Sequence, residues 1–351
     1  MDVNKAISFI EESFLKDLLK NPRVTDISYN GQDIFYVDND YGRIKNPLTI
    51  EKSAAKDFVR QIANLTEKQF SYQSPELDVS FGRYRFNALH QSICRKNNEE
   101  SVCFAIRIAS SELKFKESNS LSEEVKELLK VLVDSNVSIV IGGLTGSGKT
   151  ELQKYLISLM KENTRAIVID NILELDQFKT EQSIDLNIWQ VDEKRAAASI
   201  ENLVRNGLRS NPDWLIVAES RGKEMLDILN SSLTGHPIIT TLHAFDIDTI
   251  PTRMVRMVMM NEQKMNFKDV FNDISYHMRF YIYLKRKYLT DGLVKRYISS
   301  ISYLGNKGME EIYGSDGKNK KYKSLTEEAK KMLDLSSVSN RFKAAFIGGN
   351  K

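Results

Sequence analysis

The chain has 351 residues, of which 41% are hydrophobic and 28% are charged, and its formal net charge is +3. This composition is typical of a globular protein, and the length favours two domains because single cores rarely grow beyond about 250–300 residues. No apolar run reaches the roughly 18 residues of a membrane-spanning helix, and the net charge alone does not indicate a nucleic-acid-binding protein.

Residues 1–110 are predicted to form an α+β domain. The first residues carry acidic groups and no basic region, so we do not expect a signal peptide. Apolar side chains recur at helical spacing over residues 6–19, which predicts one helix. Strand-like segments follow between Val24 and Arg107, with a helix predicted at 52–65.

The two cysteines of the chain, Cys94 and Cys103, are too few for a disulfide framework or a zinc site. A turn is predicted at Asn97-Asn98, and if the hairpin loop there has four residues, Asn97–Glu100, strand pairing would place the two cysteines opposite each other. In the reducing cytoplasm that this cysteine content suggests, both are expected to be free thiols that pack as small apolar groups.

Residues 111–122 are polar and serine-rich, which predicts a linker, and residues 123–351 then form the second domain. Helical and strand-like patterns alternate there, with strands predicted at 137–142, 166–170, 214–218 and 237–242. This alternation predicts an α/β fold with a parallel sheet and helices on both faces. The tail, residues 279–351, is locally basic, with 16 Lys and Arg against 7 Asp and Glu.

The most informative segment is a glycine-rich loop that follows a β-branched run and has the spacing Gly143-x-x-x-x-Gly148-Lys149-Thr150. Glycines let the backbone curl until successive N–H groups point at one anion, and the following helix adds its positive dipole end. Lys149 would reach the β- and γ-phosphates, and the Thr150 hydroxyl would ligate Mg²⁺. The sequence therefore predicts that ATP and Mg²⁺ bind to Gly143, Thr145, Gly146, Ser147, Gly148, Lys149 and Thr150.

Ionisable side chains follow three other predicted strands. The strand 214–218 is followed by Glu219, which suggests an NTPase strand adjacent to the P-loop strand, with Glu219 at the Mg²⁺ or polarising the attacking water. Asp170 and Glu174 lie at and just beyond the end of the strand 166–170. His243 follows the strand 237–242, and ligands of open parallel sheets bind at the carboxyl ends of strands.

Four of the arginines in the amino-terminal domain are candidate site residues, and two of these, Arg83 and Arg85, have the alternation that places side chains on one face of a strand. Arg95 and Arg107 are the other two. Arginines beside an NTPase domain suggest contacts with the γ-phosphate, within a subunit or across a subunit boundary.

With these motifs the chain resembles the secretion traffic ATPases, which serve type II and type IV secretion, conjugation and type IV pili. The resemblance covers about residues 20–305 and includes, in family order, VTDISYNG, LDVSFGRYRFNALHQ, GLTGSGKT, IDNILEL, LVRNGLRSNPDWLIVAESRG and TGHPIITTLHA. It implies a PAS-like amino-terminal domain, a RecA-like P-loop NTPase domain and a ring-shaped homo-hexamer that binds ATP at the cleft between its domains.

The resemblance also implies roles for single residues. Lys149 and Thr150 would form the Walker A motif, Glu219 the Walker B motif, and His243 the histidine box. Arg85 and Arg107 match the family's amino-terminal arginines. The aspartate box opens with Asp170-Asn171 instead of Glu-Asp, and Ala218 replaces the glycine before the Walker B glutamate. Which of Asp170 and Glu174 orients the attacking water stays open.

The predicted function is Mg²⁺-dependent hydrolysis of ATP to ADP and phosphate by a cytoplasmic hexamer at the inner face of the cytoplasmic membrane. The implied partners are inner-membrane platform or secretion-channel proteins, and stable nucleic-acid binding is not expected. Two alternatives remain. The first is a nucleotide-dependent scaffold with little turnover, which is consistent with Asp170-Asn171 in place of the usual Glu-Asp of the aspartate box. The second is a nucleic-acid translocase, which the basic tail would permit. The sequence does not identify the machine, its cargo, or whether the motor drives assembly or retraction.

Overall fold

The computed structural model describes residues 2–110, 121–171, 175, 183–192, 195–261 and 265–348. The chain divides into two compact units. Unit 1 comprises Met1–Ser111, Ile172–Gln177 and Tyr288–Val294, and unit 2 comprises Glu112–Asn171, Phe178–Lys287 and Lys295–Lys351. Most of the predicted linker, residues 111–120, lies outside the described residues.

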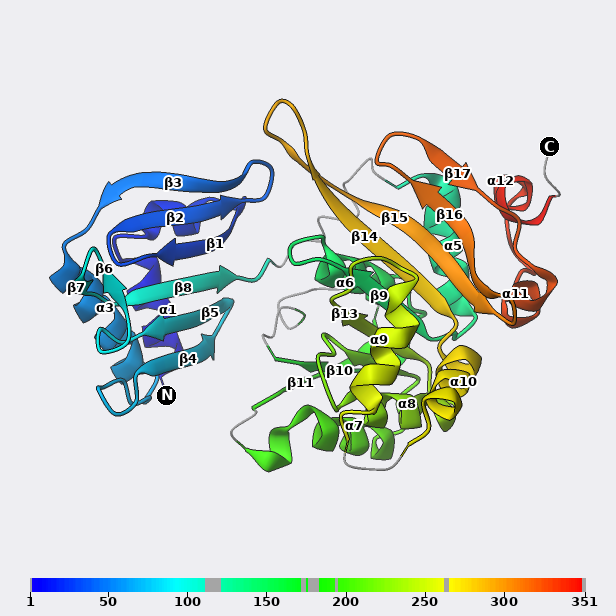
Figure 1. Ribbon diagram of the computed structural model, residues 1–351, viewed down its shortest axis with the longest axis horizontal. Coiled ribbons are helices and arrows are strands. Elements are labelled where there is room, and N and C mark those ends of the chain that lie inside the picture. Colours follow the sequence, from blue (N-terminus) through cyan, green and yellow to red (C-terminus); the bar gives the residue numbers. More distant parts are fainter. Residues whose placement is uncertain are drawn as a thin grey trace. The chain divides into compact units, whose positions relative to one another are not determined.

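Unit 1 contains a six-stranded antiparallel sheet with the strand order β3-β2-β1-β8-β5-β4 (Figure 1). Apolar side chains from alternate strand positions pack with three helices around a core that includes Phe58, Phe86 and Phe104, which confirms the predicted α+β fold. The elements are β1 (Val24–Tyr29), β2 (Asp33–Asp38), β3 (Gly42–Thr49), β4 (Glu76–Phe81), β5 (Tyr84–Leu89), β8 (Cys103–Ile108), α1 (Val3–Glu11), α2 (Lys16–Lys20) and α3 (Lys52–Leu65).

The single helix predicted at 6–19 is wrong, because α1 ends at Glu11 and α2 begins at Lys16. Ser13 explains the break. Its hydroxyl donates to the Ile10 carbonyl (2.7 Å) and accepts from the Leu15 N–H (3.2 Å). Such local bonds from a serine side chain compete with the helical ladder. The turn still buries Leu15 completely in the core.

The cysteine prediction is also wrong, because Cys94 and Cys103 form a disulfide with a Cα–Cα distance of 6.6 Å. The hairpin between them turns at Asn97-Asn98, as predicted, but its loop has two residues and not the four considered. Both asparagines have positive φ (53° and 63°), as the primed turns of two-residue hairpins require. The hairpin strands are β6 (Arg95–Lys96) and β7 (Glu99–Glu100).

Unit 2 is built on a nine-stranded sheet with the order β11-β10-β12-β13-β9-β14-β15-β16-β17. The strands from β11 to β14 pair in parallel, which confirms the predicted α/β fold, and β15 to β17 pair antiparallel. The strands are β9 (Ile139–Gly143), β10 (Arg165–Asp170), β11 (Asp185–Gln190), β12 (Trp214–Val217), β13 (Ile238–Leu242), β14 (Phe280–Tyr288), β15 (Val294–Gly305), β16 (Gly308–Ser315) and β17 (Lys320–Tyr322).

One expectation about strand order is wrong. The strand that precedes Glu219, β12, is not adjacent to the P-loop strand β9, because β13 lies between them. All three strands are parallel, so their carboxyl ends still share one edge of the sheet. Glu219 and the P-loop are therefore separated by the width of one strand, whose end carries His243.

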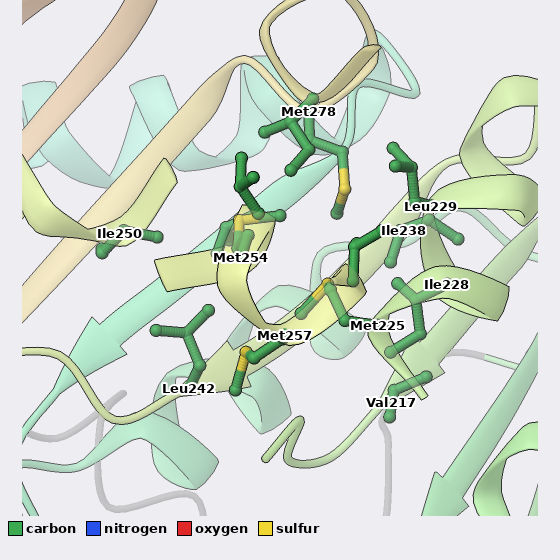
Figure 2. Close-up of a cluster of buried hydrophobic side chains, with 14 of the residues drawn as sticks. Val217, Met225, Ile228, Leu229, Ile238, Leu242, Ile250, Met254, Met257 and Met278 are labelled. Carbon is green, nitrogen blue, oxygen red and sulfur yellow. The ribbon is translucent and has the colours of Figure 1, made fainter. Parts of the chain in front are cut away.

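Helices cover both faces of this sheet. Figure 2 shows the core on one face, where Met225, Met254, Met257 and Met278 pack among aliphatic side chains from the sheet and the helices α8 and α9. On the other face, α6 packs against β9 and α5 packs against α6. The helices of unit 2 are α5 (Glu123–Asp134), α6 (Lys149–Ser158), α7 (Ile200–Arg209), α8 (Met225–Leu233), α9 (Thr249–Val258), α10 (Phe267–His277), α11 (Glu327–Met332) and α12 (Asn340–Phe342), with short turns η1 (Ala196–Ala198) and η2 (Lys343–Ile347).

Candidate functional site

The glycine-rich loop connects β9 to α6 at the carboxyl edge of the sheet. Gly148 caps α6 in the left-handed conformation (φ 101°), and Gly146 also has positive φ (72°). A Cβ atom at Gly143 would lie 2.5 Å from the Ser147 Oγ and 2.8 Å from the Leu284 carbonyl oxygen, so only glycine fits there. Because α6 begins at Lys149, the amino-terminal end of the helix, with its N–H groups and positive dipole end, faces the loop.

Lys149 reaches back over this loop and is buried there. Its Nζ atom donates to the carbonyl oxygens of Gly143 (3.0 Å) and Leu144 (3.2 Å) and lies 3.3 Å from the Nδ1 atom of His243. A protonated amine offers donors only, so Nδ1 is the acceptor and the ring proton of neutral His243 resides on Nε2. The loop and β13 are thereby joined through one lysine.

His243 in turn lies beside Glu219. The His243 Nε2 atom is 2.9 Å from Glu219 Oε1, while Glu219 Oε2 accepts a hydrogen bond from Arg221 Nη2 (2.6 Å). The structure therefore brings together three of the predicted site residues, Lys149, His243 and Glu219. It adds Arg221, to which the sequence analysis gives no role. Its position two residues after the Walker B glutamate was a signal that could have identified it.

The charges around this cluster set its protonation. Burial opposes ionisation of Glu219, but the hydrogen bond and charge of Arg221, with further positive charge at Lys149, outweigh burial and hold the pKa of Glu219 below its ordinary value. Burial lowers the pKa of His243, and the positive charge of Lys149 lowers it further. At neutral pH the cluster thus contains a carboxylate and an uncharged imidazole.

Two polar atoms of the site are buried and lack a hydrogen-bond partner within the described part of the chain: Ser147 Oγ and Glu219 Oε1. The approach of His243 to Glu219 Oε1 is close but lacks the alignment of a hydrogen bond. Buried oxygens of this kind are costly unless something satisfies them. A hydroxyl and a carboxylate beside an anion-binding loop are suited to a nucleotide phosphate with Mg²⁺ and its water ligands.

Hydroxyl groups fix the segment that carries Glu219. The Thr241 hydroxyl donates to the Ala218 carbonyl (2.7 Å), and the hydroxyls of Ser220 and Thr240 are 2.7 Å apart. Ser220 and both threonines are buried, so these bonds are shielded from water. The residues before and after Glu219 are therefore held to β13, the strand that leads to His243.

The aspartate box is only partly described. Asp170 is buried at the end of β10, and its carbonyl oxygen accepts from the Val191 N–H (3.0 Å). Glu174 lies outside the described residues. The choice between these two carboxylates as the group that orients water stays open.

The predicted arginines belong to unit 1, whereas the P-loop belongs to unit 2. Arg85 and Arg107 are directly paired across β5 and β8. Arg85 makes a two-bond contact with Asp78 (3.2 and 3.0 Å), and Arg107 donates to Asp26 (3.3 Å). Each arginine is therefore held by a carboxylate on a neighbouring part of the sheet.

The other two arginines have different surroundings. Arg83 is in the turn before β5, so it does not alternate with Arg85 along a strand, and it donates to the Tyr84 hydroxyl (3.0 Å). Arg95 is exposed in β6 of the small hairpin.

The family model for type II/IV secretion system proteins matches residues 85–274, more than half of the chain, including the P-loop, Glu219 and His243. The chain belongs to this family. It is thus a member of the secretion traffic ATPase superfamily, as its motifs predicted.

Two relatives illustrate the range of this superfamily. An uncharacterized protein of Bacillus anthracis is 28% identical over 324 residues, which cover 89% of this chain and 71% of that protein. The type IV secretion system protein VirB11 of Brucella suis is 33% identical over 130 residues, which cover 36% of each chain.

Solved structures of traffic ATPases share the fold. The Legionella pneumophila ATPase DotB superposes with a TM-score of 0.63 at 21% identity, covering 84% of this chain and 80% of that one. The pilus retraction motor PilT with bound ADP superposes with a TM-score of 0.58 at 21% identity, covering 82% and 80%. Among the described residues, no helix is both long and apolar enough to cross a bilayer.

Proposed function

We propose that this traffic ATPase hydrolyses ATP with Mg²⁺ and works as a cytoplasmic homo-hexameric motor for a membrane-embedded secretion, conjugation or pilus machine. The observation that carries the proposal is the chain of contacts from Lys149 through His243 to Glu219 at the carboxyl edge of the sheet. It links the residue suited to bind phosphate with the residue suited to activate water.

The loop supplies the phosphate site. Its N–H groups and the amino-terminal end of α6 would bind the phosphates of ATP, together with Lys149. Lys149 donates to two loop carbonyls in the structure. A phosphate oxygen is a stronger, charged acceptor than a carbonyl oxygen, so nucleotide binding would redirect the Lys149 amine toward the phosphates.

Glu219 is the group best placed to act on water. Its lowered pKa keeps it ionised at neutral pH, and its Oε1 atom is buried without a hydrogen-bond partner within the described part of the chain. Thr150 and Glu219 would hold Mg²⁺, which when bound neutralises charge on the phosphate oxygens. We further propose that Asp170 or Glu174 orients the attacking water and that Arg85 and Arg107 contribute to turnover.

Phosphate release in steady state tests the proposal. The wild-type protein is expected to release phosphate from ATP only with Mg²⁺, and Glu219→Gln is expected to retain ATP binding while losing about 10²-fold or more in rate. Binding without release in the wild type would instead support the scaffold alternative. Stimulation of release by DNA would support the translocase alternative.

Assembly needs separate measurements. Light scattering during gel filtration is expected to show a hexamer in the presence of nucleotide, and affinity purification from membranes is expected to recover an integral-membrane partner. A protein that remains monomeric at every concentration with Mg-ATP would contradict the proposed ring.

A further inference from the structure

The hairpin formed by β14 and β15 lies against the phosphate-binding loop. Arg296, in β15, donates from its Nε atom to the carbonyl oxygen of Gly146 (2.9 Å), although the two residues are 150 positions apart. Its Cδ atom would lie 3.8 Å from a Cβ atom at Gly148. Arg296 therefore bonds to the loop at Gly146, and its side chain occupies the space beside Gly148.

A second arginine of the hairpin lies beside Gly146. A Cβ atom built at Gly146 would lie 2.9 Å from the Nη1 atom of Arg286, which is in β14. The positive φ of Gly146 (72°) already disfavours a side chain there. Arg286 thus packs against the backbone of Gly146, while Arg296 donates to the carbonyl oxygen of Gly146.

The direction of this carbonyl determines the direction of a donor. The peptide unit that joins Gly146 to Ser147 is planar and trans, so its C=O and N–H groups point to opposite sides. Arg296 holds the C=O on the hairpin side. The Ser147 N–H consequently points into the loop, where it donates to the Leu144 carbonyl (3.2 Å), the same carbonyl that accepts from Lys149.

We propose that Arg296 is a positioning residue of the phosphate site: by bonding to the Gly146 carbonyl it aims the Ser147 N–H at the bound phosphates. This inference rests on the proposed ATP binding. The Nε atom of Arg296 makes the bond, so the donor at that atom matters more than the charge of the guanidinium. Without the bond, only the hydrogen bond from the Ser147 N–H to the Leu144 carbonyl still holds the peptide unit. When phosphate competes for that N–H, the donor is then less well oriented, and binding is weakened.

Two substitutions of similar size separate the donor from the charge. Arg296→Gln places an amide N–H at the position of the arginine Nε but removes the charge, whereas Arg296→Lys keeps the charge but puts a methylene group at that position. Binding of Mg-ATP and Mg-ADP by the full-length protein is measured by calorimetry, with Arg296→Ala and the wild type alongside.

We expect Arg296→Ala and Arg296→Lys to weaken the binding of both nucleotides by about tenfold to a hundredfold. Arg296→Gln is expected to remain within about threefold of the wild type. Similar losses for ATP and ADP are expected because both present a β-phosphate to the loop. Lys295→Ala is the matched control, since it removes a neighbouring charge from the same strand and should leave binding unchanged.

Other outcomes overturn the inference in distinguishable ways. If Arg296→Lys binds nucleotide as tightly as the wild type but Arg296→Gln does not, only the charge of the side chain matters. If all three variants bind like the wild type, Arg296 does not position the loop. If Arg296→Ala fails to fold, the glutamine and lysine variants still decide. Failure of the wild type to bind nucleotide more tightly than Lys149→Ala would instead overturn the proposed function itself.

Discussion

The Nζ atom of Lys149 lies 3.3 Å from the Nδ1 atom of His243, across 94 positions of sequence. If the imidazole became protonated, its positive charge would lie close to that of the buried Lys149 amine. Burial lowers the pKa of His243 and the charge of Lys149 lowers it further, while the nearby Glu219 carboxylate acts in the opposite direction and raises it. The imidazole is thus kept neutral between two groups of opposite charge.

Titration of the histidine ring protons by NMR checks this arrangement, since the chain has only 4 histidines to assign. The pKa of His243 is expected below its ordinary value of about 6.5. Lys149→Met removes the positive charge and should raise that pKa, whereas Glu219→Gln removes the negative charge and should lower it further. A rise in Glu219→Gln, or a fall in Lys149→Met, would contradict the contacts of His243.

Lys149→Ala is expected to abolish turnover, because it deletes the charge that would face the β- and γ-phosphates. Contacts of this kind contribute about 10²–10³-fold to rate. Lys161→Ala is the control, since Lys161 is exposed and outside the loop. Phosphate release is measured at saturating Mg-ATP, with circular dichroism to check the fold. A Lys149→Ala rate above about a tenth of the wild-type rate would argue against the assignment of the P-loop.

Arg85→Ala and Arg107→Ala are each expected to lower turnover strongly while nucleotide binding stays within about tenfold of the wild type, because the P-loop backbone supplies most of the ground-state affinity. An arginine that stabilises transferring phosphate can contribute about 10³–10⁵ in rate. Arg95→Ala serves as the control, since Arg95 is exposed in the small hairpin. Normal turnover in both variants would remove the amino-terminal arginines from the mechanism.

The disulfide between Cys94 and Cys103 gives a prediction for unit 1. Purified protein that is denatured without reductant should bind no thiol reagent, and it should bind two equivalents after reduction. The double variant Cys94→Ser/Cys103→Ser is expected to lose about 2–3 kcal/mol of stability against urea, since the bond closes a short loop. Two reactive thiols before reduction would restore the expectation of free cysteines.

Several features could be predicted from the sequence because they depend on short-range chemistry. The helix predicted at 52–65 coincides with α3, and the alternation of helices and strands predicted the parallel sheet correctly. The P-loop was predictable because glycine spacing reflects local backbone demands, which Gly146 and Gly148 meet with positive φ. The roles assigned to Glu219, Asp170, Glu174 and the arginines stay predictions.

Other elements were missed although a signal was present. Along α9 the apolar residues Ile250, Met254, Met257 and Val258 recur at helical spacing, so this helix was within reach of the same periodicity argument. The strand β11 carried a weaker signal, because at the edge of the sheet its residues are only partly buried and include several polar side chains.

The family, the two fold types and the phosphate-binding loop could be identified from the sequence alone, because each depends on residues that lie close together along the chain. Three features were visible only in the folded chain: β13 separates β12 from β9, His243 lies between Lys149 and Glu219, and Arg296 bonds to the loop. The physical reason is that strand order and contacts across 94 or 150 positions depend on which surfaces pack together. Local propensity carries no information about that choice.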